Sequence, residues 1–118
     1  MQEYIEEFHR TFGCNVDDKV TAPVLDLRQR LIDEEFEELM ESIESARCQL
    51  ILTGRVGPKV GKELFKELGD LVYVCYGLAV SFGVDLDDVI KKIHESNMSK
   101  LDKNDKPIYR EDGKVLKS

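Results

Sequence analysis

The sequence predicts an all-α fold, a four-helix bundle-like subunit with a short C-terminal β-hairpin. Three observations support this prediction. Apolar residues recur at three- and four-residue steps along four segments of the chain. Glycine or proline separates these segments, and the connections between them are short, as is typical of helical bundles. Because 118 residues support a single hydrophobic core, residues 1–118 are expected to form one domain.

The first two helices are predicted from apolar spacing and from one proline. Residues 2–12 form the first helix, with these apolar residues at helical spacing: Tyr4, Ile5, Phe8 and Phe12. The segment Thr21-Ala22-Pro23 resembles a helix start, because proline is favoured in the first turn. A long second helix is therefore expected from about Pro23 to about Arg47. Its recurring apolar residues are Val24, Leu27, Leu31, Leu39 and Ile43.

The third helix is predicted between two glycine breaks. Gly57-Pro58 interrupts the pattern, and a helix is expected from about Val60 to about Phe82. Gly83 then stands where a glycine commonly ends a helix in the left-handed conformation.

The fourth helix and the hairpin complete the predicted elements. Asp85 is expected to cap the fourth helix, which stops near Leu101. In the tail, Asp112-Gly113 lies between two short segments of alternating apolar and polar residues, which indicates a two-stranded hairpin over 107–116. An isolated hairpin is marginally stable, so it is expected to pack against a helix or another subunit.

Composition and charge limit the classes of function. The chain is 42% hydrophobic and 35% charged, which is typical of a globular protein, and its net charge of −7 disfavours general nucleic-acid binding. Its longest apolar run, Leu71 to Val80, is too short to span a bilayer, and its N-terminus lacks the pattern of a secretory signal. The odd number of cysteines, three, favours reduced thiols. A cytoplasmic protein without membrane or nucleic-acid partners is expected.

Two acidic motifs lie inside the predicted helices, Glu35-x-x-Glu38 in the second and Glu67-x-x-Asp70 in the third. Residues three apart share one face of a helix, so each motif presents two carboxylates in one direction. At about 100° of rotation per residue, these four acids fall within the apolar stripes of their helices. Four inward acids are difficult to stabilise, because an unpaired buried carboxylate costs several kcal/mol.

A divalent cation would resolve this conflict. Hard cations prefer oxygen ligands, and Mg²⁺ in particular completes its coordination with water and substrate phosphates. Mn²⁺ is the expected substitute. Glu34 lies on the flank of the same stripe and is a candidate general base for an attacking water. A structural alternative pairs the acids with basic residues across helices, for which the following are available: Arg28, Arg30, Lys62 and Lys66.

The residues 30–39, Arg-Leu-Ile-Asp-Glu-Glu-Phe-Glu-Glu-Leu, followed by 66–73, Lys-Glu-Leu-Gly-Asp-Leu-Val-Tyr, resemble the all-α nucleoside triphosphate pyrophosphohydrolases. This superfamily includes MazG, the dimeric dUTPases and the phosphoribosyl-ATP pyrophosphohydrolases, and its signature is E-x-x-E, a spacer, and E-x-x-D. The resemblance covers the chain from about Leu25 to Leu101, and the tail looks like a stretch found in the phosphoribosyl-ATP branch.

The resemblance implies roles for seven residues and a reaction. Those that would bind Mg²⁺ are Glu35, Glu38, Glu67 and Asp70. Glu34 would activate water, and Asn97 and Lys100, which match an N-x-x-K pattern, would face the substrate. The implied reaction is Mg²⁺-dependent hydrolysis of a nucleoside triphosphate, a dNTP or a non-standard NTP, to the monophosphate and pyrophosphate. Relatives assemble as dimers or tetramers, so a homo-oligomer is expected.

Three alternatives remain open at this stage. Within the same chemistry, phosphoribosyl-ATP is the second substrate candidate. A non-enzymatic helical oligomerisation or regulatory module, with the acids in interhelical ion pairs, is a different class. A carboxylate-bridged di-iron bundle ranks last, because it requires Glu-x-x-His pairs, whereas Glu95 follows His94 directly.

Overall fold

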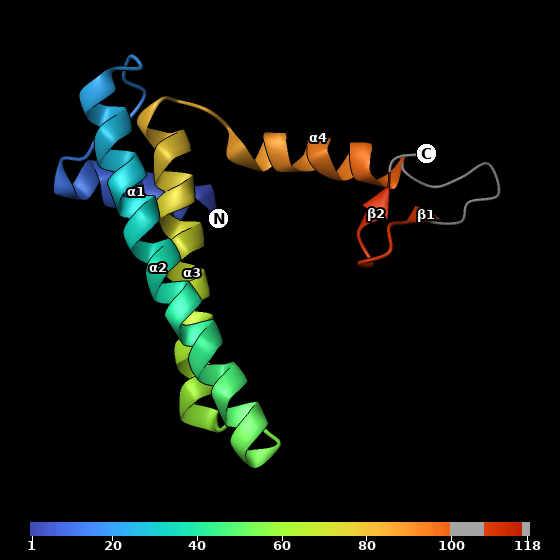
Figure 1. Cartoon of the computed structure of the whole chain (residues 1–118). Coiled ribbons are helices and arrows are strands. Elements are labelled where there is room, and N and C mark those ends of the chain that lie inside the picture. The colour runs from blue at the N-terminus through green and yellow to red at the C-terminus, as the bar shows by residue number, and fades with distance from the viewer. Residues whose placement is uncertain (100–107, 117–118) are drawn as a thin grey trace. The chain divides into compact units, whose positions relative to one another are not determined.

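The computed structural model describes residues 1–99 and 108–116 and contains four helices (Figure 1). These are α1 (Gln2–Phe12), α2 (Ala22–Thr53), α3 (Pro58–Ser81) and α4 (Leu86–Met98). The prediction of an all-α fold with four helices is confirmed. The chain divides into two compact units, Met1–Val84 and Asp85–Ser118.

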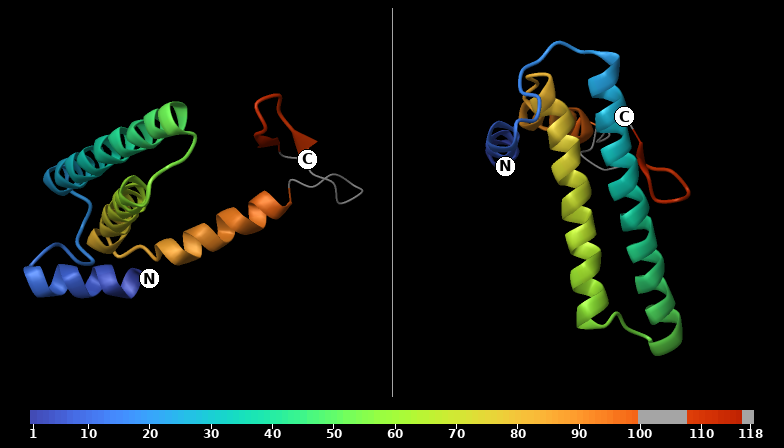
Figure 2. Two further views of the ribbon diagram at one scale, coloured as in Figure 1. Left: turned by 90° about the horizontal axis from the view of Figure 1, so that it is seen from below. Right: turned by 90° about the vertical axis from the view of Figure 1, so that its left-hand side faces the viewer.

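Helices α2 and α3 form the centre of the first unit. They lie side by side and run in opposite directions, joined by the short segment 54–57 (Figure 2). The predicted end of the second helix near Arg47 is wrong, because α2 continues to Thr53. No glycine or proline interrupts residues 48–53, and the helix ends only where Gly54 adopts a φ of 79°.

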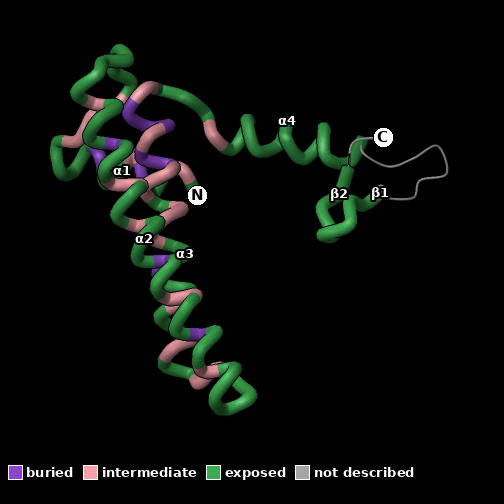
Figure 3. Tube along the Cα trace, in the orientation of Figure 1, coloured by how far each residue is buried: buried purple, intermediate pink, exposed green. Residues whose placement is uncertain are grey.

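Helix α1 packs against α3 and completes the first unit. The loop after α1 is attached to the end of α3, since the Asp17 and Asp18 amides donate to the Val80 and Ser81 carbonyls at 3.1 and 2.8 Å. Buried residues gather where these elements meet (Figure 3). Among the described residues, the buried apolar ones are Ile5, Leu39, Ala46, Tyr76, Ala79 and Val80.

The two predicted signals around Gly83 are confirmed. Gly83 has a φ of 70°, and the Val84 amide donates to the Ala79 carbonyl at 2.9 Å, as expected of a helix that ends with a left-handed glycine. The side chain of Asp85 then accepts from the Asp88 amide at 3.1 Å and caps α4.

The second unit contains α4 and two short strands, β1 (Ile108–Tyr109) and β2 (Val115–Leu116). The strands pair antiparallel, with Ile108 opposite Leu116 and Tyr109 opposite Val115. The hairpin stays a prediction, because each strand has only two residues. The assembly of all four helices into one bundle also stays a prediction, because α4 belongs to the second unit. Among the described residues, no single helix is long and apolar enough to cross a membrane. Helices α3 and α4 have the necessary length and composition only when they are taken together, with a break between them.

Candidate metal site

Three of the four motif carboxylates meet between α2 and α3. Glu35, Glu38 and Glu67 each offer one oxygen, and these oxygens all lie within 4.8 Å of one another. The geometry follows from the sequence, because Glu35 and Glu38 share one face of α2 and the antiparallel α3 brings Glu67 opposite them. The three acids differ in burial: Glu67 is buried, Glu35 is half-buried and Glu38 is exposed. The expectation of four inward acids is therefore wrong for Glu38 in the isolated chain.

Two oxygens of this cluster are buried and lack a hydrogen-bond partner, Oε2 of Glu35 and Oε2 of Glu67. Buried carboxylate oxygens normally accept hydrogen bonds, because losing water without compensation costs about 1–3 kcal/mol per group. Oxygen atoms from three carboxylates are also the ligand type that a hard divalent cation prefers. The residues present therefore fit a divalent cation.

Crowding of negative charge raises the pKa of Glu38. Its pKa is raised from 4.5 to about 7, first because it shares a hydrogen bond with Glu67 and then because the charges of Glu35 and Glu67 lie close to it. Three adjacent carboxylates share a proton when no cation is present to balance them. A cation would replace that proton.

The fourth motif residue, Asp70, is held by a neighbouring lysine. Lys66 Nζ lies 2.9 Å from Asp70 Oδ2 and 3.5 Å from Glu67 Oε1, and both contacts stay on α3. The ammonium group therefore balances part of the charge of the site, and the two acids raise the pKa of Lys66. The sequence pattern predicts Asp70 together with the other three acids, whereas its oxygens lie outside their group. An i,i+4 lysine is the sequence signal that identifies this pairing.

The structural alternative of interhelical ion pairs lacks support in the described parts of the chain. Every ion pair found in residues 1–99 and 108–116 joins residues of the same helix or turn, and none connects α2 with α3. Of the four basic residues available for such pairs, only Lys66 contacts the motif acids, and it does so from their own helix.

The remaining predicted site residues lie in three places. Glu34 is exposed on α2, directly before Glu35. Asn97 is exposed in the last turn of α4, within the second unit. Lys100 lies outside the described residues.

A polar cavity one helical turn from the carboxylates was not anticipated. It has a volume of about 320 Å³ and is lined by Ser42, Ser45, Lys59, Val60 and Glu63. Ser42 follows Glu38 by four residues on α2, and Glu63 precedes Glu67 by four residues on α3, so the cavity continues the same groove. The i+4 spacing shows that Ser42 and Glu63 share a face with the motif acids, but the sequence carries no signal for the cavity itself.

The fold and the site define an all-helical protein whose central helix pair brings three carboxylates together in an arrangement suited to a divalent cation. The chain belongs to the phosphoribosyl-ATP pyrophosphohydrolase family, which matches it over residues 5–97. This family is part of the MazG-like all-α NTP pyrophosphohydrolase superfamily, so the resemblance seen in the motifs is confirmed. Its enzymes hydrolyse phosphoric anhydrides of nucleotides and generally depend on a divalent metal.

A viral relative shares most of the chain. The uncharacterized protein L479 of Acanthamoeba polyphaga mimivirus is 26% identical in an alignment that covers 97% of this chain and 41% of the relative. The chain thus spans about two fifths of the length of the relative that it matches.

Proposed function

We propose that this chain is a Mg²⁺-dependent pyrophosphohydrolase that cleaves the anhydride between the α- and β-phosphates of a nucleotide. The observation that carries the proposal is the cluster of Glu35, Glu38 and Glu67. In this cluster, one buried oxygen of Glu35 and one of Glu67 lack hydrogen-bond partners. Asp70 would join these ligands once Lys66 releases it. Mn²⁺ is the expected substitute, because it accepts the same oxygen ligands.

The reaction consumes one water. The oxygen of water forms a bond to the α-phosphorus, the bond from that phosphorus to the bridging oxygen breaks, and the products are a nucleoside monophosphate and pyrophosphate. The cation, when bound, neutralises charge that develops on the phosphates. Glu34, next to Glu35 and exposed to solvent, would accept the proton of the attacking water. Asn97 and Lys100 would contact the substrate.

Two substrate classes fit this chemistry. A dNTP or non-standard NTP is the first, and the polar cavity beyond Glu38 and Glu67 offers space for its nucleoside. Phosphoribosyl-ATP is the second, and the family match favours it at least as well. The role with NTPs would be removal of surplus or non-standard nucleotides in the cytoplasm.

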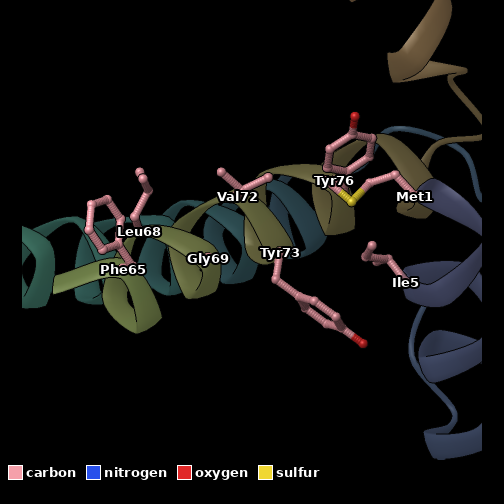
Figure 4. Close-up of a pocket in the computed structure, with 8 residues that line it drawn as sticks. All are labelled: Met1, Ile5, Phe65, Leu68, Gly69, Val72, Tyr73 and Tyr76. Atoms are coloured by element: carbon pink, nitrogen blue, oxygen red, sulfur yellow. The ribbon is translucent and has the colours of Figure 1, made fainter. Parts of the chain in front are cut away.

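A homodimer or tetramer is also proposed. Phe65, Leu68 and Tyr73 on α3 are 68, 42 and 37% exposed, and they line an apolar cavity of about 380 Å³ together with Met1 and Ile5. Figure 4 shows Phe65 and Leu68 projecting to the same side of α3. Exposed apolar surfaces of this kind mark protein interfaces. Light scattering after size exclusion measures the mass, and a strictly monomeric protein would contradict the proposal.

The decisive experiment screens modified and canonical (d)NTPs together with phosphoribosyl-ATP, with Mg²⁺ or Mn²⁺, and measures release of pyrophosphate. Glu38→Gln is expected to abolish turnover while the protein stays folded. Glu37→Gln, an exposed neighbour, is the matched control and should retain activity. If no nucleotide is cleaved and Glu38→Gln alters only the stability, the acids serve a structural module and the proposed activity is refuted.

A further inference from the structure

Helix α2 carries a buried arginine two turns before the carboxylate site. Arg28 is 5% exposed, and its Nε atom is buried without a hydrogen-bond partner. No acid of residues 1–99 or 108–116 forms an ion pair with it. Within the described residues, this largely buried guanidinium group therefore has no anionic partner.

An unpaired buried cation is strongly unfavourable. Placing a single charge in a protein interior costs several kcal/mol even after relaxation, and the usual escape is loss of the charge. Arginine cannot take this route, because its guanidinium group stays protonated in proteins. An anion bound in the cavity that Arg28 lines would compensate this charge.

His9 lies next to Arg28 and does not provide this compensation. Its Nδ1 lies 2.7 Å from the Asn15 carbonyl oxygen, which can only accept, so Nδ1 carries the proton. Burial lowers the pKa of His9, and Arg28 lowers it further against the opposing effect of the bond to Asn15. These effects favour the neutral ring, which carries no negative charge to balance Arg28.

A glycine on α3 lets these two side chains pack directly against the helix backbone. A Cβ atom at Gly77 would lie 2.7 Å from Nη1 of Arg28 and 3.2 Å from Nε2 of His9. Glycine inside a helix costs about 1 kcal/mol relative to alanine, so its presence here requires a steric reason. The reason is the room that the guanidinium group and the imidazole ring occupy.

Arg28, His9 and Gly77 line a cavity of about 230 Å³. Its other walls are largely apolar, with Phe8, Leu31 and Val74 among them, and such surroundings strengthen a charge-assisted hydrogen bond. Pockets for drug-sized ligands measure roughly 300–1,000 Å³, so this one suits a small anion or a single phosphoryl group. The planar guanidinium group pairs with phosphate through two parallel hydrogen bonds.

We propose that the Arg28 pocket binds a small oxyanion of the phosphate class, at a position distinct from the carboxylate site. Arg28 precedes Glu35 by seven residues, which is about 10 Å along the helix axis. The oxyanion therefore has two possible sources, a terminal phosphate of a nucleotide that also reaches the carboxylates, or free phosphate. Both supply the same chemistry to Arg28.

The test titrates inorganic phosphate into the metal-free full-length protein at constant ionic strength, with calorimetry and thermal unfolding as readouts. Saturable binding and a rise in Tm are expected for the wild type. Arg28→Met should weaken phosphate binding at least tenfold, and Arg28→Lys should weaken it by a smaller factor, because lysine keeps the charge without the paired hydrogen bonds. Arg30→Met, which removes an exposed arginine from the same helix, is the matched control and should bind as the wild type does.

A second arm identifies the source of the oxyanion. Phosphate is titrated again in the presence of Mg²⁺ and a non-hydrolysable nucleoside triphosphate. If the nucleotide competes with inorganic phosphate, the pocket binds a phosphate of the nucleotide. If both bind simultaneously, the pocket binds free phosphate. Both outcomes support the proposed pocket. Absence of saturable phosphate binding to the wild type, or unchanged binding to Arg28→Met, overturns it. Because the first arm uses neither metal nor turnover, its failure is distinguishable from failure of the proposed hydrolysis.

Discussion

Replacement of Glu67 by glutamine tests the electrostatic coupling inside the carboxylate cluster. In the wild type without metal, the pKa of Glu38 is about 7 instead of 4.5, and the hydrogen bond to Glu67 is the largest cause. Glu67→Gln removes that shared proton and one of the two negative charges that act on Glu38. It also introduces an amide that donates to the ionised form. The pKa of Glu38 is therefore expected to fall by roughly 1–2 units.

The assay is a pH titration of the side-chain carboxyl carbons by NMR in metal-free buffer. Glu63→Gln, which removes an acid one turn earlier on α3, is the control and should leave the pKa of Glu38 near 7. A wild-type Glu38 that titrates near 4.5, or one that is unaffected by Glu67→Gln, would refute the proposed coupling.

Thermal stability alone is a poor readout of this coupling. A carboxyl group whose pKa is raised in the folded state stabilises the metal-free protein below pH 4.5, and that contribution is lost as the pH rises through about 7. The lowered pKa of His9 has the opposite sign, because its contribution is present above pH 6.5 and is lost as the pH falls. The two effects overlap between these pH values, so a site-specific titration is required.

Three further predictions concern the metal, an ion pair and the core. Mg²⁺ must displace the proton of Glu38, so the affinity of the protein for Mg²⁺ should fall roughly tenfold per pH unit below 7. Calorimetry at several pH values measures this affinity, and an affinity that does not change with pH would contradict displacement. Lys66→Met should leave the free energy of unfolding nearly unchanged, because the exposed pair with Asp70 is weak. It should nevertheless tighten Mg²⁺ binding by releasing that carboxylate. Leu39→Ala should lower the free energy of unfolding, measured with denaturant, by roughly 2–4 kcal/mol, because Leu39 is buried. Met40→Ala, at an exposed neighbouring position, should lower it by less than about 1 kcal/mol. Equal losses in the two variants would disprove the burial of Leu39.

Local signals in the sequence predicted the helices and most of their ends. The start of α1, the glycine at position 83 and the cap at Asp85 depend on residues a few positions apart, so they are readable without tertiary contacts. The predicted end of α2 near Arg47 comes too early, because Leu50 continues the apolar spacing from Ile43 and Ala46 and nothing in residues 48–53 breaks a helix. Propensity and hydrogen bonding along the helix extend it to Gly54.

The sequence by itself determined the four-helix content, and it selected four acids, three of which meet in the structure. The reason is that the period of a helix fixes which residues share a face. Only the tertiary structure decided which acids approach one another across α2 and α3, since that depends on the register of two antiparallel helices. It separated Asp70, held by Lys66, from the other three carboxylates. It also placed Arg28, which the sequence offered as an ion-pair partner, in a buried position beside His9 and Gly77. Sequence spacing determines a face of one helix, whereas distance and burial arise from the packing of several.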